Sequence, residues 1–426
     1  MNSTHAAHHP VEDVVTTRDD PRPRSRSRSS SRSGVGRSSR RFTVPLLVGG
    51  AALSLLAVGV PTASAVVDPV RGRGTVTVPV SATITVPGPA FGRPLPEPAG
   101  VRALLDRMPD GVLDSALVRV SASNGQRPWV GATPDLDPDA VRPIGSVTKL
   151  YTGVVLLQLV AEGRIGFDDP VRARLPALIP AEWSKVTVRQ LLDHTSDLPH
   201  PVPAPAEGNA PAAVVRASFA AVAPSERTPA PGTLQRYNGL NTLVAGLLIE
   251  NLTGHGYADE LRHRVTGPLG LRQTRLSSDP SVAWAWAEGG MESTPAETDR
   301  FLTALLGGRL LPAATQRHLF EVPDVPLAPT TSCPGDTACF SGGGLMRVDL
   351  GGGVVAWGKT GTMGPWTGGA FATKDLTRKV VYQTRPHPGA AGTAIQERLT
   401  TLAAKSLAPT TPPSTPTPAP MPEPGR

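Results

Sequence analysis

The spacing of apolar residues along the chain predicts several helices. Apolar side chains recur every three or four residues over Ser146–Glu162, and Gly163 ends that run. The same spacing predicts three further helices, at Val188–His194, Asn241–Asn251 and Thr298–Leu306. The segment Pro199–Pro231, between the helices expected at Val188–His194 and Asn241–Asn251, contains eight prolines. We expect that segment to be mostly loop, because proline interrupts helices and strands.

A different pattern, typical of strands, begins near residue 116 and returns after residue 340. Apolar and polar residues alternate over Ala116–Ala122, and four later runs rich in β-branched residues are separated by glycines: Leu345–Leu350, Val354–Gly358, Thr367–Thr373 and Lys379–Tyr382. We therefore expect an α/β fold of the α+β kind. Its antiparallel sheet would combine the N-terminal strands with residues 340–405 and be flanked by helices, with an all-helical region from about 165 to 335 inserted and a cleft between the two parts.

The N-terminal 65 residues have the composition of an export signal. Residues 1–42 hold nine arginines and four acidic residues, and the uncharged stretch 43–65 ends in Ala63-Ser64-Ala65, a small-residue cleavage pattern. We expect a cleaved signal and a secreted, extracellular protein, with cell-wall association left open. The alternative is an uncleaved membrane anchor, because about twenty apolar residues can span a bilayer. A membrane partner is expected only in that case.

Composition divides the remaining chain into three parts. Residues 66–100, rich in Val, Pro and Gly, predict a linker of low order, and residues 406–426 predict an extended Pro/Thr-rich tail. The globular domain is expected at 101–405. The chain of 426 residues carries a net charge of +7, most of it in the leader. A nearly neutral domain lacks the basic surface that phosphate backbones require, which excludes nucleic acid as a main partner.

The two cysteines, Cys333 and Cys339, are separated by five residues that include the turn Pro334-Gly335. In an oxidising compartment we expect a disulfide bond between them. Two free thiols are the alternative. No metal site is expected, since two thiolates without nearby histidines provide only half of a tetrahedral zinc site.

Ser146 and Lys149 carry the first sign of chemistry. They lie three residues apart at the start of the apolar helix, so both side chains reach the same face. A serine hydroxyl needs a base to become a nucleophile, and a lysine serves as that base only if burial or another cation lowers its pKa. Taken alone the pair is a weak signal, because a serine at a helix start is commonly an N-cap.

Longer blocks around this pair follow one another in a recognisable order. They are Arg142–Lys149, Leu157–Arg164, Val186–Leu198, Pro231–Thr233, Leu252–Tyr257, Pro268–Leu271, Gly289–Thr294 and Gly358–Thr362. Over roughly residues 101–405 the chain resembles the penicillin-recognising serine hydrolases, specifically the secreted D-alanyl-D-alanine carboxypeptidases that share the class C β-lactamase fold. The resemblance implies a β-lactamase/transpeptidase-like architecture and hydrolysis through an acyl-serine.

The same resemblance implies roles for single residues. Ser146 would be the nucleophile, with Lys149 and Tyr237 moving protons. The cation of Lys359 in the block Lys359-Thr360-Gly361 would steady the substrate carboxylate, and the backbone N–H groups of Ser146 and Thr362 would form the oxyanion hole. The expected partners are peptidoglycan stem peptides, small amides or esters, and β-lactams. No cofactor is required, and a monomer is expected.

Two features depart from the family pattern. The motif Tyr-x-Asn reads Tyr237-Asn238-Gly239, so the place of the asparagine that holds the substrate amide is taken by a glycine. Unless Asn238 or Asn241 reaches the site, Gly239→Asn is expected to improve peptide cleavage. Only fourteen residues separate Thr274 from Gly289, where relatives carry a longer excursion that lines part of the cleft.

These departures keep alternatives open. The chain could be a β-lactamase or an esterase of the same fold, or a catalytically impaired binding protein. His194, in the block Asp193-His194-Thr195-Ser196, is expected to be structural and not the base of a catalytic triad.

Overall fold

The computed structural model describes residues 76–77, 83–84, 92–226, 229–329, 333 and 337–408. The expected export signal, most of the expected linker and the tail from residue 409 lie outside these ranges. Of the linker, β1 (Val76–Thr77) and β2 (Thr83–Ile84) are described and pair with each other in antiparallel fashion.

An antiparallel sheet forms one part of the domain. In the described residues it has six strands in the order β4-β3-β11-β10-β9-β8. The strands are β3 (Leu113–Ser121), β4 (Trp129–Ala132), β8 (Met346–Asp349), β9 (Val355–Met363), β10 (Trp366–Thr373) and β11 (Lys379–Pro386). The N-terminal strand β3 pairs with the C-terminal strand β11, so the two ends of the domain meet in one sheet, as predicted.

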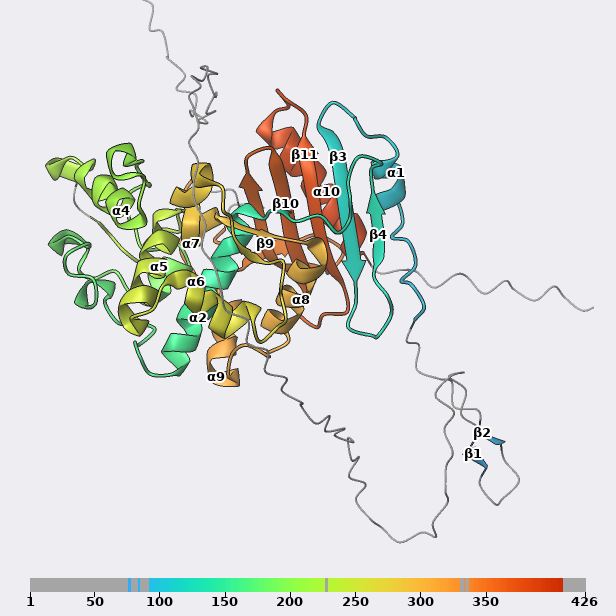
Figure 1. Cartoon of the computed structure of the whole chain (residues 1–426), viewed down its shortest axis with the longest axis horizontal. Coiled ribbons are helices and arrows are strands. Elements are labelled where there is room, and N and C mark those ends of the chain that lie inside the picture. Colours follow the sequence, from blue (N-terminus) through green and yellow to red (C-terminus); the bar gives the residue numbers. More distant parts are fainter. Residues whose placement is uncertain are drawn as a thin grey trace, which may run out of the picture. The chain divides into compact units, whose positions relative to one another are not determined.

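Helices cover both faces of this sheet (Figure 1). On one face lie α1 (Val101–Leu105) and α10 (Gly392–Leu407), and on the other lies α8 (Pro295–Leu306). Alternate residues of β11 therefore enter different cores, because neighbouring side chains on a strand point to opposite faces. Tyr382 packs in the cluster formed with α10, whereas Val381 packs in the cluster formed with the helical region.

The chain between β5 and β8 builds the helical region. Its helices are α2 (Thr148–Ala161), α3 (Val188–Leu192), α4 (Pro211–Ala220), α5 (Leu240–Thr253), α6 (Tyr257–Leu261), α7 (Trp286–Gly289) and α9 (Ala313–Gln316). A small sheet in the order β5-β7-β6 joins β5 (Arg142–Pro143), β7 (Met291–Ser293) and β6 (Arg275–Leu276). Both α2 and α5 are buried over most of their length, which explains why apolar residues occupy nearly every side of them.

Shorter helical turns connect these elements. They are η1 (Gly145–Val147), η2 (Val171–Ala173), η3 (Ala181–Trp183), η4 (Pro205–Glu207), η5 (Pro224–Glu226), η6 (Arg262–Thr266), η7 (Pro280–Ala285) and η8 (Arg317–Phe320). Among the described residues, no helix combines the length and the apolar character needed to cross a membrane.

The expectation that Pro199–Pro231 is mostly loop was wrong at its centre. That segment contains α4, which begins at Pro211. Proline is well tolerated in the first turn of a helix, where its missing N–H would have no helical partner, and the following Ala-Ala-Val-Val run buries Val214 and Val215. The C-terminal helix α10 was not predicted at all.

Candidate active site

Ser146 lies in η1, the turn that leads directly into α2. One helical turn later, Lys149 Nζ donates a hydrogen bond of 3.1 Å to Ser146 Oγ. The Lys149 side chain is only 3% exposed, whereas Ser146 is half-buried. The structure thus brings the hydroxyl and the amine together with the hydroxyl on the accessible side.

A carboxylate that the sequence analysis missed completes this pair. Glu288, in α7, forms a short ion pair with Lys149 through Oε2, and its backbone carbonyl accepts a second hydrogen bond of 2.7 Å from Nζ. Burial by itself would lower the pKa of Lys149, but the Glu288 carboxylate raises it above the ordinary value. Lys149 is therefore held as a cation, which makes it a poor proton acceptor for Ser146. The sequence feature that could have pointed to Glu288 is its place as a single acidic residue directly after the uncharged stretch 280–287.

Tyr237 is the better proton acceptor of the two. Its ring centre lies 5.2 Å from Lys149 Nζ and 4.6 Å from Lys359 Nζ. Burial raises the pKa of a phenol, yet the two lysines outweigh it and lower the pKa of Tyr237 below its ordinary value, with a hydrogen bond to Ser146 contributing in the same direction. The geometry favours Tyr237 as the base and Lys149 as a fixed positive charge.

Strand β9 lies against η1 at the point where an oxyanion would form. A Cβ atom placed on Gly361 would lie 2.1 Å from the Ile144 carbonyl oxygen and 2.8 Å from the Ser146 backbone nitrogen. Only a glycine allows this approach. On the other side, Gly145 has a positive φ of 50°, and a Cβ atom placed on it would lie 2.5 Å from the Thr362 backbone nitrogen. The backbone N–H groups of Ser146 and Thr362 are thus held at neighbouring positions, as an oxyanion hole requires.

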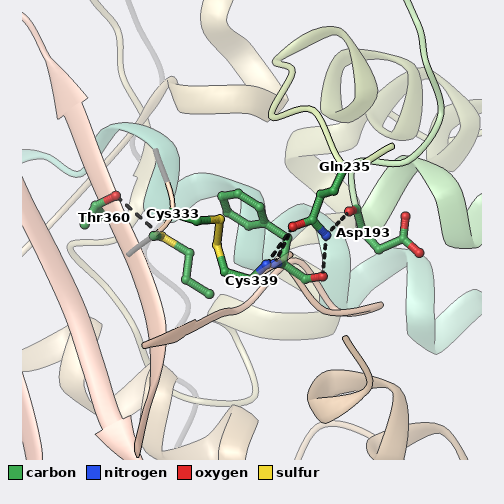
Figure 2. The surroundings of a disulfide bond; sticks show 7 residues. Asp193, Gln235, Cys333, Cys339 and Thr360 are labelled. Atoms are coloured by element: carbon green, nitrogen blue, oxygen red, sulfur yellow. Dashed lines mark hydrogen bonds between the residues drawn. A yellow bond between two sulfur atoms is a disulfide. The ribbon is translucent and has the colours of Figure 1, made fainter. Parts of the chain in front are cut away.

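Lys359 and Thr360 point to opposite sides of β9, as neighbours on a strand must. Lys359 is buried, and its Nζ lies 5.4 Å from the Phe340 ring centre in addition to its contact with Tyr237. Burial lowers the pKa of Lys359. The Thr360 hydroxyl instead donates to Met346 Sδ (Figure 2). The structure therefore brings Lys359 to the Tyr237 ring that Lys149 also approaches, but turns the Thr360 side chain away from that ring.

Neither nearby asparagine takes the place of the missing motif residue. Asn238 Nδ2 donates to the carbonyl oxygens of Leu198 and Pro199. Asn241 binds His194 Nδ1 at 3.0 Å and also bonds to the Ser196 hydroxyl. Both amides thus have structural partners.

His194 supports Tyr237 by packing against it. The two ring centres are 4.7 Å apart, and Nδ1 of His194 accepts from the Asn238 backbone N–H. Burial, with the positive charges of Lys149 and Lys359, holds the pKa of His194 well below its ordinary value. A neutral, fully packed imidazole agrees with the structural role expected for this residue.

The predicted disulfide bond between Cys333 and Cys339 is confirmed in the structure, with the Cα atoms 5.9 Å apart. Gln235 fixes the segment after it (Figure 2): Oε1 accepts from the backbone N–H groups of Cys339 and Phe340, and Nε2 donates to the Asp193 and Phe340 carbonyls. Phe340 in turn stacks on Tyr237 with ring centres 5.1 Å apart. The disulfide segment therefore forms part of the wall around Tyr237.

The described residues provide no group of three or more His, Cys, Asp or Glu side chains placed to hold a metal ion.

Comparison of the sequence with known proteins identifies related hydrolases and penicillin-binding proteins. A family model described as beta-lactamase matches residues 108–400. The chain is 27% identical over 251 residues to the D-alanyl-D-alanine-carboxypeptidase/endopeptidase AmpH of Escherichia coli (strain K12), covering 50% of this chain and 64% of that protein. It is 31% identical over 183 residues to penicillin-binding protein 4 of Amycolatopsis lactamdurans, covering 41% and 48%. The chain thus spans less than two thirds of the length of either relative.

Solved structures match over more of their length. A D-stereospecific amidohydrolase from Streptomyces sp. has a TM-score of 0.60 at 28% identity, covering 71% of this chain and 98% of that one. The D-amino acid amidase of Ochrobactrum anthropi SV3 shares the fold, with a TM-score of 0.59 at 21% identity, covering 72% and 97%. Since the family match extends over most of the domain and the folds agree, this chain belongs to the beta-lactamase family.

Proposed function

We propose that the protein is a serine hydrolase that forms an acyl-enzyme on Ser146 and cleaves an amide bond next to a D-amino acid, as in peptides ending in D-alanyl-D-alanine. The observation that carries this proposal is the 3.1 Å hydrogen bond between Lys149 Nζ and Ser146 Oγ, placed beside the close contact of η1 with β9. Nucleophile, fixed cation and oxyanion donors then surround one reacting carbonyl.

In the proposed reaction Ser146 Oγ attacks the carbonyl carbon and its proton passes to the Tyr237 phenolate. The backbone N–H groups of Ser146 and Thr362 hold the negative carbonyl oxygen. The C–N bond then breaks, and the leaving amine takes the proton from Tyr237. Water attacks the acyl-serine in the second half, losing its proton to Tyr237, and Ser146 recovers its hydrogen as the acid leaves. Lys149 and Lys359 favour the phenolate form of Tyr237 that accepts each proton, because both lower its pKa.

The choice of substrate rests on similarity and on the site together. A D-alanyl-D-alanine carboxypeptidase/endopeptidase and a D-stereospecific amidohydrolase are both among the similar proteins. Lys359, buried beside Tyr237, is placed to attract an anionic group such as a terminal carboxylate. A β-lactamase or esterase activity, or a penicillin-binding role without turnover, are the competing possibilities.

The test combines covalent labelling with turnover. The wild-type protein is incubated with a fluorescent penicillin and weighed intact, and hydrolysis of a D-alanyl-D-alanine peptide and of D-alanine p-nitroanilide is followed separately. We expect one adduct and cleavage of at least one amide. Ser146→Ala should lose both, whereas Ser123→Ala, at an exposed turn, should keep both. A lasting adduct without amide cleavage would favour the binding role. An adduct that is lost rapidly, again without amide cleavage, would favour a β-lactamase. Labelling of Ser146→Ala would overturn the assignment of Ser146 as the nucleophile.

Export also stays a proposal, supported by the arginine-rich leader followed by an uncharged stretch and by the disulfide bond, which an oxidising compartment preserves.

A further inference from the structure

Gly239 and Glu288 face each other beside the nucleophile. Gly239 is the N-cap residue immediately before α5, and Glu288 lies in α7. A Cβ atom on Gly239 would lie 2.9 Å from Glu288 Oε2, 3.1 Å from Cδ and 3.5 Å from Oε1. Both carboxylate oxygens therefore occupy the space into which any side chain at position 239 would extend.

This space is the one where the family pattern places an asparagine amide. Asn238 and Asn241 are engaged elsewhere, so the carboxylate of Glu288 is the polar group that fills it. The side chain is only 13% exposed, and its position is fixed because Lys149 binds both Oε2 and the Glu288 backbone carbonyl. The glycine and the glutamate thus form a matched pair.

Replacing an amide by a carboxylate changes what can bind. An asparagine side chain both donates and accepts hydrogen bonds, so it pairs with either side of a substrate amide, whereas a carboxylate only accepts. A carbonyl oxygen placed against Glu288 would find no donor there, while an N–H or an ammonium would find an acceptor. Lys149 binds Oε2, and within the described part of the chain no hydrogen bond reaches Oε1. Oε1 is therefore the oxygen that a substrate donor would meet.

The distance to the reaction fits an amino group on the substrate. Lys149 Nζ contacts Ser146 Oγ and Glu288 Oε2 at once, so one ammonium separates the nucleophile from the carboxylate. In a substrate whose carbonyl carbon meets Ser146 Oγ, the α-nitrogen is two bonds away from that carbon, roughly 2.5 Å. The scissile amide nitrogen is closer to the carbonyl carbon but carries no charge, so the α-ammonium is the substrate nitrogen that the Glu288 carboxylate would attract.

We propose that Glu288 is a specificity-determining residue, and that its carboxylate, given room by Gly239, selects substrates with a free α-amino group over substrates whose α-nitrogen is acylated. This inference rests on the proposed amide hydrolysis at Ser146. It assigns to the enzyme D-amino acid amides and peptides with a D-residue at a free N-terminus. A longer peptide ending in D-alanyl-D-alanine, whose reacting D-alanine is N-acylated, would then be a poorer substrate than the free dipeptide.

The test uses three substrates with the same leaving group. D-Alanine p-nitroanilide has the free ammonium, N-acetyl-D-alanine p-nitroanilide has it acylated, and D-lactate p-nitroanilide has a hydroxyl of similar size in its place. For the wild-type enzyme we expect kcat/KM for the free amine to exceed that for the other two by about tenfold or more. In Glu288→Gln, which keeps the shape and removes the charge, that ratio should fall about tenfold.

Matched variants separate this effect from misfolding. Glu292→Gln removes a carboxylate four residues further on, which pairs with Arg275, and should leave the ratio unchanged. Because the measured quantity is a ratio within one protein preparation, a partly unfolded variant does not change it. Equal cleavage of the free and acetylated substrates by the wild type, or an unchanged ratio in Glu288→Gln, would overturn the inference alone. Cleavage of none of the three anilides or of the D-alanyl-D-alanine peptide would overturn the proposed hydrolysis as well.

Discussion

At the scale of single residues, the site is governed by charges that are buried close together. Lys149 and Lys359 both lie against the ring of Tyr237, and Glu288 compensates the first of them. Removing charges of one sign from water is costly unless opposite charges are near, so each of these groups sets the protonation of the others. Glu288 keeps Lys149 charged. Tyr237 is able to lose its proton because Lys149 and Lys359 lower its pKa, an effect that the Glu288 carboxylate partly opposes.

The first prediction concerns Gly239→Asn. The sequence alone suggested a gain in peptide cleavage, but the structure predicts a loss, because the new side chain would displace the Glu288 carboxylate from Lys149. We expect kcat/KM for D-alanine p-nitroanilide to fall by about tenfold, the size of effect that loss of one charged contact produces.

The double variant Gly239→Asn/Glu288→Ala provides the control for this prediction. It removes the clash, so the asparagine gains the space, and it should cleave the N-acetyl substrate better than Gly239→Asn does. An increase in free-amine cleavage by Gly239→Asn alone would contradict the matched-pair interpretation.

At the scale of elements, catalytic geometry depends on two backbone segments that touch. Strand β8 pairs with one edge of β9 over Val355–Gly358, and beyond Gly358 that edge lies against η1, while the other edge of β9 pairs with β10. Because Gly361 has no side chain, this close contact is possible. Ser146 and Thr362 thus receive their relative positions from main-chain packing, which is more rigid than side-chain contact.

The second prediction concerns Gly361→Ala. A methyl group 2.1 Å from the Ile144 carbonyl oxygen must push β9 away from η1 and separate the two oxyanion donors. Loss of one such donor costs on the order of a hundredfold in turnover, and we expect a decrease of that size in the rate of penicillin acylation, measured by stopped-flow fluorescence.

Gly392→Ala is the matched control, since Gly392 begins α10 with nothing within 4 Å of its Cβ position. That variant should acylate at the wild-type rate. A wild-type rate in Gly361→Ala would show that the oxyanion is held elsewhere.

At the scale of the whole molecule, a buried polar junction joins the helical region to the disulfide segment that precedes β8. Asp193, the residue at which α3 ends, is 3% exposed and accepts from the Thr195 backbone N–H and hydroxyl. Its backbone carbonyl binds Gln235, which also holds the disulfide segment. Stability and site geometry therefore depend on the same residues.

The third prediction is a pH dependence of stability caused by Asp193. Burial raises the pKa of Asp193 from 3.8 to about 6. The unfolded chain loses this proton near pH 4 and the folded chain near pH 6, so the folded state loses stability as the pH rises between these values. Asp193→Asn, which keeps the acceptor and does not titrate, should gain stability relative to wild type over that window, by on the order of 2 kcal/mol at pH 7.

Urea unfolding at pH 4, 5, 6 and 7 measures this difference. Asp168→Asn gives the opposite slope and serves as the comparison, because the hydrogen bond from Arg189 lowers the pKa of Asp168. Its carboxylate stabilises the fold above its unfolded pKa, and that contribution is lost as the pH falls. A stability difference between Asp193→Asn and wild type that stays constant from pH 4 to 7 would contradict the assignment.

The sequence by itself determined the elements whose apolar pattern is long or regular. The helices at α2, α3, α5 and α8 and the strands β3, β8, β9, β10 and β11 lie where periodicity placed them. Helix α4 was obscured by the prolines around it, and α10 was missed because it buries only one narrow face, with Leu399 and Leu402 against the sheet. Local pattern predicts elements well where burial is extensive and poorly where a helix is mostly exposed.

For the site, the sequence determined the pair Ser146 and Lys149, because their spacing within one helix fixes their proximity. It also indicated Tyr237 and Lys359 through ordered motifs. Only the tertiary structure decided that Glu288 joins them, since it lies 139 positions after Lys149 in the sequence and nothing local connects the two. The same packing decided that the space beside Gly239 is filled by the Glu288 carboxylate and is not empty. Chain periodicity describes contacts within an element, whereas charges that meet across elements depend on how those elements pack.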